Sequence, residues 1–236
     1  MSERLKIAIP NGQLEEGVLG VARGMGLEFQ EPGREYFIPV RNMPIDFVVL
    51  RASDIPSFIK DDTSRIKTGI TGSDILWEAG MGRSAGQELP YNGNPEFQPA
   101  LFVGVTEEFA ARIQQEAGRD PSPQDLSGHA MATKFPRIAG EYLGERAVSS
   151  VRINPVAGKI EAMQHVYWDC IGVLDVVESG KTREANGIRE LERFYEVTVR
   201  MIEAADRLTP SEKGILEDLK EKIWIKRQEL TAVMSV

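Results

Sequence analysis

The sequence lacks the residues that disulfides, zinc sites and membrane spans require. Its single cysteine, Cys170, excludes an intrachain disulfide framework and is expected to lie in the core. The two histidines, His129 and His165, are far apart and give no zinc-site spacing. The apolar run at residues 7–10 is too short for an export signal or a membrane span, which needs about 18 apolar residues or more. We therefore expect a cytoplasmic protein that has no membrane segment and no metal held by protein ligands alone.

The balance of charge excludes a further class of partner. The chain has 28 basic and 36 acidic residues, for a net charge of −8, so nucleic acid is not an expected partner. An anionic substrate must then be held by a local arrangement of donors and cations, because the net negative charge of the protein repels it. The 236 residues are 42% hydrophobic, which is enough for one large or two small domains with buried cores.

Short apolar runs alternate with amphipathic segments along the chain. The expected strands cover residues 5–10, 36–40, 45–51, 66–71, 101–105, 129–133, 148–153 and 171–177. Helices are expected between them, with Ser53 and Ser73 as caps of two short ones and others over 106–117, 136–145 and 159–166. His165, Tyr167 and Trp168 are expected to pack rather than to act in catalysis. This alternation predicts an α/β fold with largely parallel sheets.

A segment rich in Gly, Pro and Asn at residues 80–99 is expected to cross between two domains. Domain I is predicted at residues 1–97 plus 181–204, domain II at 98–180, and a C-terminal helix with a tail at 205–236. Two such α/β domains with a cleft between them resemble the lobes of type II periplasmic binding proteins. Ligands in such folds bind at the carboxyl ends of strands.

The last helix opens on a capping box. Thr209 and Glu212 have the spacing at which each side chain bonds the other residue's amide. Ile215, Leu219 and Ile223 then form one apolar stripe. This stripe fits two alternatives equally: packing on the chain's own core, or contact with a partner or a second copy.

The segment from Asp175 to Gly187 has the clearest pattern of residues for binding a ligand. An apolar strand runs into this segment, and Asp175 lies near the end of that strand, where its carboxylate can accept bonds from two sugar hydroxyls. It is followed by Ser179-Gly180-Lys181-Thr182, where small residues let main-chain amides surround a phosphate. A Walker A loop would need glycine where Asp175 stands, so a P-loop NTPase is disfavoured. An ordinary tight turn is the alternative.

This segment resembles the phosphoribosyl pyrophosphate (PRPP) loop of the ATP phosphoribosyltransferase family, which opens histidine biosynthesis. Other blocks agree with that family in order and spacing over roughly residues 4–204. They are Lys6-Ile-Ala-Ile-Pro10, Asn42-Met-Pro-Ile-Asp46, Leu50-Arg-Ala-Ser-Asp-Ile-Pro56, Gly69-Ile-Thr-Gly-Ser-Asp74, Ala132-Thr-Lys-Phe-Pro136 and Gly158-Lys-Ile-Glu161. The resemblance is to the short form, which works with a regulatory subunit similar to histidyl-tRNA synthetase, and it implies a homo- or hetero-oligomer.

The resemblance implies a transfer of the 5-phosphoribosyl group from PRPP to N1 of ATP, with release of pyrophosphate. The residues that it assigns to PRPP are Glu161, Asp175, Glu178, Ser179, Gly180, Lys181 and Thr182. Those that it places at the nucleotide are Pro10, Asn11, Gly12, Gly72, Ser73 and Asp74. Arg34 and Arg51 are the implied catalytic cations, and Mg²⁺ is expected to be carried by the pyrophosphate. Without the family, these arginines and Glu161 would be taken for solvated surface residues, and Asp74 for a helix cap.

Several positions depart from the family pattern. Gln13 and Leu101 stand where the family commonly has cations, and Arg183 stands where it has leucine. Because the losses fall on the nucleotide side, they leave two alternatives open. One is a catalytically silent protein that binds PRPP or a nucleotide, and the other is a transferase that uses another acceptor.

Overall fold

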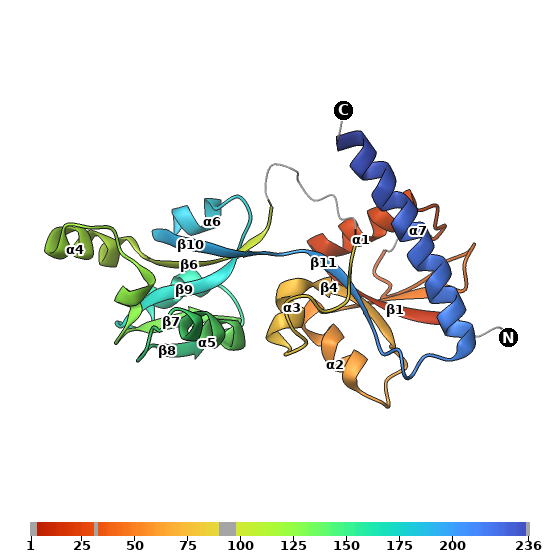
Figure 1. The fold of residues 1–236 in the computed structure, drawn as a ribbon, viewed down its shortest axis with the longest axis horizontal. Helices are drawn as coiled ribbons and strands as arrows, with labels where there is room; N and C mark the ends of the chain where they lie inside the picture. The colour runs from red at the N-terminus through yellow and green to blue at the C-terminus, as the bar shows by residue number, and fades with distance from the viewer. Residues whose placement is uncertain (1–3, 31–32, 90–97, 235–236) are drawn as a thin grey trace. The chain divides into compact units, whose positions relative to one another are not determined.

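The computed structural model describes residues 4–30, 33–89 and 98–234. The chain divides into two compact units, Met1–Gly93 with Thr198–Val236, and Asn94–Val197. Each unit has its own sheet and its own helices (Figure 1). This confirms the expected α/β class with two domains. Among the described residues, no helix combines the length and the apolar character that crossing a bilayer requires.

The first unit is built on a six-stranded sheet with the order β2-β3-β1-β4-β11-β5. Its strands are β1 (Leu5–Pro10), β2 (Phe37–Pro39), β3 (Ile45–Leu50), β4 (Thr68–Gly72), β5 (Gln87–Glu88) and β11 (Val199–Glu203). The three central strands β3, β1 and β4 run parallel, whereas the strands beside them are antiparallel. All side chains of β4 and nearly all of β1 are buried, because helices cover both faces of the sheet.

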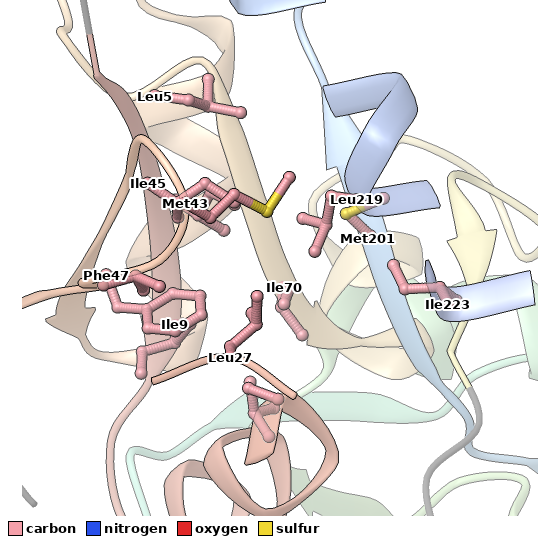
Figure 2. Close-up of a cluster of buried hydrophobic side chains, with 14 of the residues drawn as sticks. Leu5, Ile9, Leu27, Met43, Ile45, Phe47, Ile70, Met201, Leu219 and Ile223 are labelled. Carbon is pink, nitrogen blue, oxygen red and sulfur yellow. The ribbon is translucent and has the colours of Figure 1, made fainter. Parts of the chain in front are cut away.

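Helices α1 (Gln13–Gly24) and α7 (Pro210–Met234) cover one face of this sheet. The other face carries η1 (Ala52–Asp54), α2 (Ile55–Lys60) and α3 (Ser73–Glu78). In the core of the first face, Leu219 and Ile223 of α7 approach Met201 and Ile70 of the sheet (Figure 2). The apolar stripe of the last helix therefore packs on the chain's own core. This decides against the alternative that the stripe faces a partner.

Gly69 lies in β4 at a point where the sheet and α2 are in close contact. A Cβ at this position would lie 2.5 Å from Cγ2 of Ile55. We expect Gly69→Ala to lower the free energy of unfolding by roughly 1–3 kcal/mol, because the core must shift to admit the methyl group. Urea denaturation measures this loss. Gly20→Ala is the control: it lies on the exposed side of α1 with no atom within 4 Å, and should gain roughly 0.5–1 kcal/mol.

The predicted capping box at the start of α7 is confirmed. The amide of Thr209 donates to Glu212 Oε2 (2.8 Å), and the amide of Glu212 donates to Thr209 Oγ1 (3.2 Å). Lys67 Nζ adds an ion pair to the same carboxylate at 2.7 Å. Burial alone would raise the pKa of Glu212, but the bonds from Lys67 and the Thr209 amide outweigh it and leave the pKa below its usual value.

The depressed pKa of Glu212 predicts a loss of stability in acid. A lowered folded-state pKa stabilises the protein above the unfolded pKa of 4.5, and this contribution disappears as the pH falls through the folded value. Glu212→Gln removes it at neutral pH, and we expect a loss of about 1–2 kcal/mol. Urea denaturation at pH 7 and in acid should show the two proteins converging as the pH falls. A constant difference between them would contradict this account.

The second unit has a five-stranded sheet with the order β10-β6-β9-β7-β8. Its strands are β6 (Ala100–Thr106), β7 (Ala130–Thr133), β8 (Arg152–Pro155), β9 (Cys170–Val177) and β10 (Ile188–Glu196). Its helices are α4 (Glu107–Ala117), η2 (Pro123–Leu126), α5 (Pro136–Glu145), η3 (Ile160–His165) and α6 (Lys181–Ala185). Strands β8, β7 and β9 are parallel, β6 pairs antiparallel with β9, and β10 pairs antiparallel with β6. Cys170 is buried in this unit, as expected.

The second domain boundary differs from the prediction. The chain returns to the first unit at residue 198 rather than 181, because β10 forms a long antiparallel ladder with β6. The segment after it, 205–236, belongs to the first unit through α7 rather than standing apart. The predicted first boundary, at residue 97, lies outside the described residues.

Four expectations were wrong in whole or in part. The sheets are mixed rather than largely parallel, since antiparallel strands flank each parallel set. The strand expected at 148–153 lies at Arg152–Pro155, and the helix expected at 159–166 is the 3₁₀ helix η3. His165, Tyr167 and Trp168 do not pack in the core: His165 is exposed, and Tyr167 and Trp168 are 44% and 96% exposed.

Candidate functional site

The carboxyl ends of β7 and β9 bring together the polar residues of the second unit. These two strands are parallel, with Thr133 opposite Leu174, so the residues that follow them emerge at the same edge of the sheet. Lys134 Nζ lies 2.9 Å from Asp175 Oδ1 across this edge. Asp175 Oδ1 also accepts a hydrogen bond of 2.7 Å from the amide of Val176. The carboxylate that the sequence placed at a strand end is therefore fixed by two donors.

Lys134 is a site residue that sequence reasoning missed. It lies inside the block Ala132-Thr-Lys-Phe-Pro136, which resembles the family pattern. The signal was nevertheless present: the strand expected at 129–133 ends just before Lys134, and the strand expected at 171–177 ends just after Asp175. The prediction did not establish that these two strands are neighbours, and only that pairing places the lysine beside the aspartate.

The segment after β9 forms a tight bend that leads into α6. Gly180 holds the bend with φ of 77°, a left-handed conformation that glycine adopts without strain. The first helical hydrogen bond is made by the amide of Glu184 to the carbonyl of Gly180 (3.0 Å). The amides of Lys181 to Arg183 precede that bond, so α6 provides no acceptor for them. The bend therefore presents main-chain donors beside Ser179 and Thr182, both of which are exposed.

Glu161 lies on η3, which is tied to this bend. Gln164 Nε2 donates to the carbonyl of Glu161 (3.0 Å) and to the carbonyl of Asn186 (2.8 Å), so one amide joins η3 to the end of α6. Asn186 in turn donates to the carbonyl of Thr182 (2.7 Å). Buried Ile160 anchors η3 in the core beneath. Gln164 thus ties the helix that carries Glu161 to the end of α6, and a contact of the Glu161 carboxylate with PRPP stays a prediction.

Arg183, which replaces the usual leucine, folds back against the bend rather than into solvent. A Cβ on Gly180 would lie 3.2 Å from Arg183 Nη2, and the Arg183 side chain is only 15% exposed. Its nearest carboxylates are Glu184 at 3.3 Å and Glu190 at 3.7 Å. Arg183 therefore acts as a support on the inner side of the loop.

Glu178, at the start of the bend, borders a hollow of about 410 Å³ in the second unit. The other residues that line it are Gln98, Ala100, Arg193, Phe194, Tyr195 and Glu196. The hollow lies where β6 and β10 meet the end of β9, since Ala100 pairs with both Val177 and Glu196. The bend that begins at Glu178 thus has open space beside it on the β10 side.

In the first unit, the parallel strands β1, β3 and β4 end at one edge of the sheet. Pro10 ends β1 and the exposed pair Asn11-Gly12 follows, with the amide of Asn11 donating to the carbonyl of Leu50 (2.8 Å). Arg51 follows β3 and is exposed. Gly12 has φ of 82°, so it too uses the left-handed region. The side chain of Gln13 lies outside the described residues.

Arg34 comes to the same edge through β2. Phe37 pairs with Val48, and the amide of Val49 donates to the carbonyl of Tyr36 (2.9 Å), so the segment before β2 runs back along the end of β3. Arg34 is exposed there, in a short turn fixed by the amide of Gly33 donating to Glu35 Oε2 (2.9 Å). Within the described residues, neither Arg34 nor Arg51 has a carboxylate partner. The two predicted catalytic arginines are therefore gathered at one edge of the first unit.

The three residues predicted after β4 are less accessible. Ser73 is buried, with its amide donating to the carbonyl of Thr198 (2.8 Å) and its Oγ accepting from the amide of Thr198 (3.0 Å). Asp74 is 7% exposed, and Gly72 is buried as the last residue of β4. Ser73 thus fastens the point where the chain returns to the first unit. A nucleotide contact of Gly72, Ser73 or Asp74 stays a prediction.

No group of three or more His, Cys, Asp or Glu side chains in the described part of the chain could hold a metal ion. Asp175 and Glu161 are carboxylates that could contact a cation carried by a phosphorylated ligand.

In the second unit, a carboxylate near the end of a strand is followed by a bend of main-chain donors, an arrangement suited to an enzyme that handles a phosphorylated sugar. The family model for ATP phosphoribosyltransferase matches residues 51–224. The chain belongs to the ATP phosphoribosyltransferase family. The expected class of enzyme, a pentosyltransferase at the first step of histidine biosynthesis, is confirmed with it.

Individual relatives agree. An ATP phosphoribosyltransferase of Rhodopirellula baltica is 31% identical over 221 residues, which are 90% of this chain and 68% of that protein. One of Thermococcus gammatolerans is 27% identical, covering 84% of this chain and 86% of its own length.

Solved structures support the fold. The ATP phosphoribosyl transferase (HisG:HisZ) complex from Thermotoga maritima contains a chain that superposes with a TM-score of 0.69 at 19% identity, covering 95% of this chain and 99% of that one. The alkanesulfonate-binding protein SsuA from Xanthomonas axonopodis pv. citri gives 0.55 at 9% identity, covering 99% of this chain and 76% of that one. The expected likeness to periplasmic-binding-protein lobes is thereby confirmed at the level of the fold.

Proposed function

We propose that this chain transfers the 5-phosphoribosyl group of PRPP to N1 of ATP and releases pyrophosphate. The observation that carries the proposal is the junction of β9 and α6, where fixed Asp175 is followed by the Gly180 bend. PRPP has a diol and a phosphate on one sugar. The diol suits the carboxylate of Asp175, and the phosphate suits the main-chain amides of the bend that follows it.

The donor is proposed to bind through both parts of this junction. The 5-phosphate takes the amides and hydroxyls of the loop from Glu178 through Ser179, Gly180 and Lys181 to Thr182. Asp175 and Glu161 accept hydrogen bonds from the ribose hydroxyls, which are the donors that a carboxylate can hold in pairs. Glu178 and Glu161 are acidic beside a polyanion, so the loop amides and Lys181 must offset their repulsion.

In the reaction, the bond from ribose C1 to pyrophosphate breaks and a bond from C1 to N1 of adenine forms. Negative charge develops on the departing pyrophosphate while the ribose takes on oxocarbenium character. Alignment of the two substrates can supply roughly 7–11 kcal/mol of the barrier. Arg34 and Arg51 are proposed to stabilise the departing pyrophosphate, because an arginine can bind phosphate oxygens in pairs. Pro10, Asn11 and Gly12, with the segment Gly72–Asp74, are proposed for the nucleotide.

Mg²⁺ is proposed to enter with the pyrophosphate of PRPP. This ion usually keeps several waters and binds one or two carboxylates plus substrate phosphates, so a preformed protein cage is not needed. When bound, it would neutralise part of the charge on the leaving group. Asp175 and Glu161 are the carboxylates at the donor site that could contact it.

We further propose that the chain is cytoplasmic and works in an oligomer with a regulatory subunit similar to histidyl-tRNA synthetase. The support is the similar fold of the chain from the Thermotoga maritima HisG:HisZ complex. The apolar stripe of α7 is not available for that contact, since it packs on the first unit.

The function is tested by mixing the protein with PRPP, Mg²⁺ and ATP in the presence of pyrophosphatase and recording the ultraviolet absorbance of the N1 adduct. Formation of the adduct is expected either by the chain alone or by the chain together with a regulatory subunit. PRPP binding without any turnover would support a silent binding protein instead. Pyrophosphate release only with another base or nucleotide would show a different acceptor.

A further inference from the structure

Lys134 has no role in the function proposed so far, although it contacts the central carboxylate of the donor site. We propose that Lys134 is a positioning residue for the donor: it holds Asp175 Oδ1 so that Oδ2 is presented to the ribose hydroxyls. The proposal rests on the function above, and specifically on Asp175 binding ribose.

The main chain around Lys134 is fixed to β9 and to the start of α5. Thr133 Oγ1 donates to the carbonyl of Leu174 (2.8 Å) and accepts from the amide of Phe135 (2.9 Å), and this hydroxyl is fully buried. One side chain thus anchors the residue before Lys134 to the residue before Asp175. The reach from Lys134 to Asp175 is set by this buried contact, in addition to the pairing of the strands.

The two oxygens of Asp175 are not equivalent. Oδ1 receives both the ammonium of Lys134 at 2.9 Å and the amide of Val176 at 2.7 Å. Oδ2 makes no hydrogen bond within the described parts of the chain. The carboxylate is therefore held in one orientation with one oxygen still open, which is the state that an acceptor for a sugar hydroxyl requires.

In the ion pair between Lys134 and Asp175, the lysine side chain is more exposed than the aspartate side chain. The side chain of Lys134 is 41% exposed, and that of Asp175 is 17% exposed. Exposed pairs add little to stability, so a purely structural role explains this contact poorly. The positive charge of Lys134 would instead favour binding of the donor. The donor is a polyanion, and Glu161 and Glu178 add negative charge to the part of the second unit that is proposed to bind it. A lysine bound to Asp175 removes one negative charge from that surface without blocking Oδ2.

The test measures binding of two probes by calorimetry, with ribose 5-phosphate carrying the diol and inorganic phosphate lacking it. K134M should weaken ribose 5-phosphate roughly ten- to a hundredfold, the size expected for one bond to a charged group. Inorganic phosphate should change less than about twofold, because the loop that binds it is untouched. K134R keeps the cation and should retain more affinity for ribose 5-phosphate than K134M. K134Q serves the same comparison if K134M does not fold.

A double-mutant cycle separates positioning from a direct contact. In a D175N background, K134M should add less than about a twofold loss, since the group that it positions has already been changed. R137M is the matched control: Arg137 lies on α5 near Lys134, is exposed, and pairs with Glu141 at 3.2 Å, so its loss should leave ribose 5-phosphate binding unchanged.

Two results would overturn the inference. One is a folded K134M protein, shown by its thermal unfolding, that binds ribose 5-phosphate as tightly as the parent. The other is an equal loss for inorganic phosphate, which would make Lys134 a phosphate ligand. A parent protein that binds neither PRPP nor ribose 5-phosphate would instead refute the proposed function itself, so the two failures are distinguishable.

Discussion

Replacing Arg34 by methionine is expected to lower kcat roughly 10²–10³-fold with a much smaller change in the KM for ATP. The reason is the charge that develops on pyrophosphate as its bond to ribose breaks. Arg34 is exposed at the strand-end edge of the first unit and has no carboxylate partner among the described residues, so its charge is not already neutralised. A cation that binds the leaving group more strongly in the transition state than in the ground state acts on kcat.

The measurement is steady-state formation of the N1 adduct, with Arg51→Met examined in the same way. Arg41→Met is the matched control, because Arg41 is an exposed arginine of the same unit at the opposite end of β3. It should keep full activity. A rise in the KM for ATP with unchanged kcat in Arg34→Met would show instead that Arg34 binds the nucleotide in both states.

Most of the fold follows from local patterns in the sequence. Residues 5–10 and 136–145 are bounded by prolines or by clear changes in apolar spacing, and the structure has β1 and α5 at those same bounds. Thr106 caps α4 by accepting from the amide of Phe109 (3.2 Å), as its residue type favours. Signals of this kind depend on neighbours in the chain, which is why they can be predicted from it.

Strand β10 could not be predicted in the same way. It is an edge strand with the charged sequence of Ile188–Glu196, and its ladder with β6 is interrupted at two places, between Glu190 and Glu192 and between Arg193 and Tyr195. Each irregularity shifts the alternation of faces, so no period of two survives in the sequence. The missed strand caused the wrong domain boundary at residue 181.

In the candidate site too, local features could be predicted from the sequence, whereas contacts between distant segments could not. The order of Asp175 and the small residues after it is a local property, so the loop was found from the sequence. The pairing of Lys134 with Asp175 depends on which strands are neighbours, and so does the burial of Ser73 beneath Thr198. Both are contacts between segments far apart in the chain, and no spacing within one segment encodes them.

Replacing Gly180 by valine is expected to lower kcat/KM for PRPP roughly a hundredfold or more. Gly180 has φ of 77°, which a β-branched residue adopts at a considerable cost. A Cβ there would also lie 3.2 Å from Arg183 Nη2, so the support behind the loop must move. Both effects displace the amides of Lys181 and Thr182, which are proposed to hold the 5-phosphate.

The loss should appear in the affinity for PRPP, measured by calorimetry, and in adduct formation, while the thermal unfolding of the protein changes much less. Gly144→Ala is the control, because Gly144 lies on α5 with no atom within 4 Å and no positive φ. Gly180→Ala should lie between the parent and Gly180→Val, since it adds the strain without the branched side chain. A Gly180→Val protein that binds PRPP as tightly as the parent would place the 5-phosphate elsewhere, because no donor that uses these amides could tolerate their displacement.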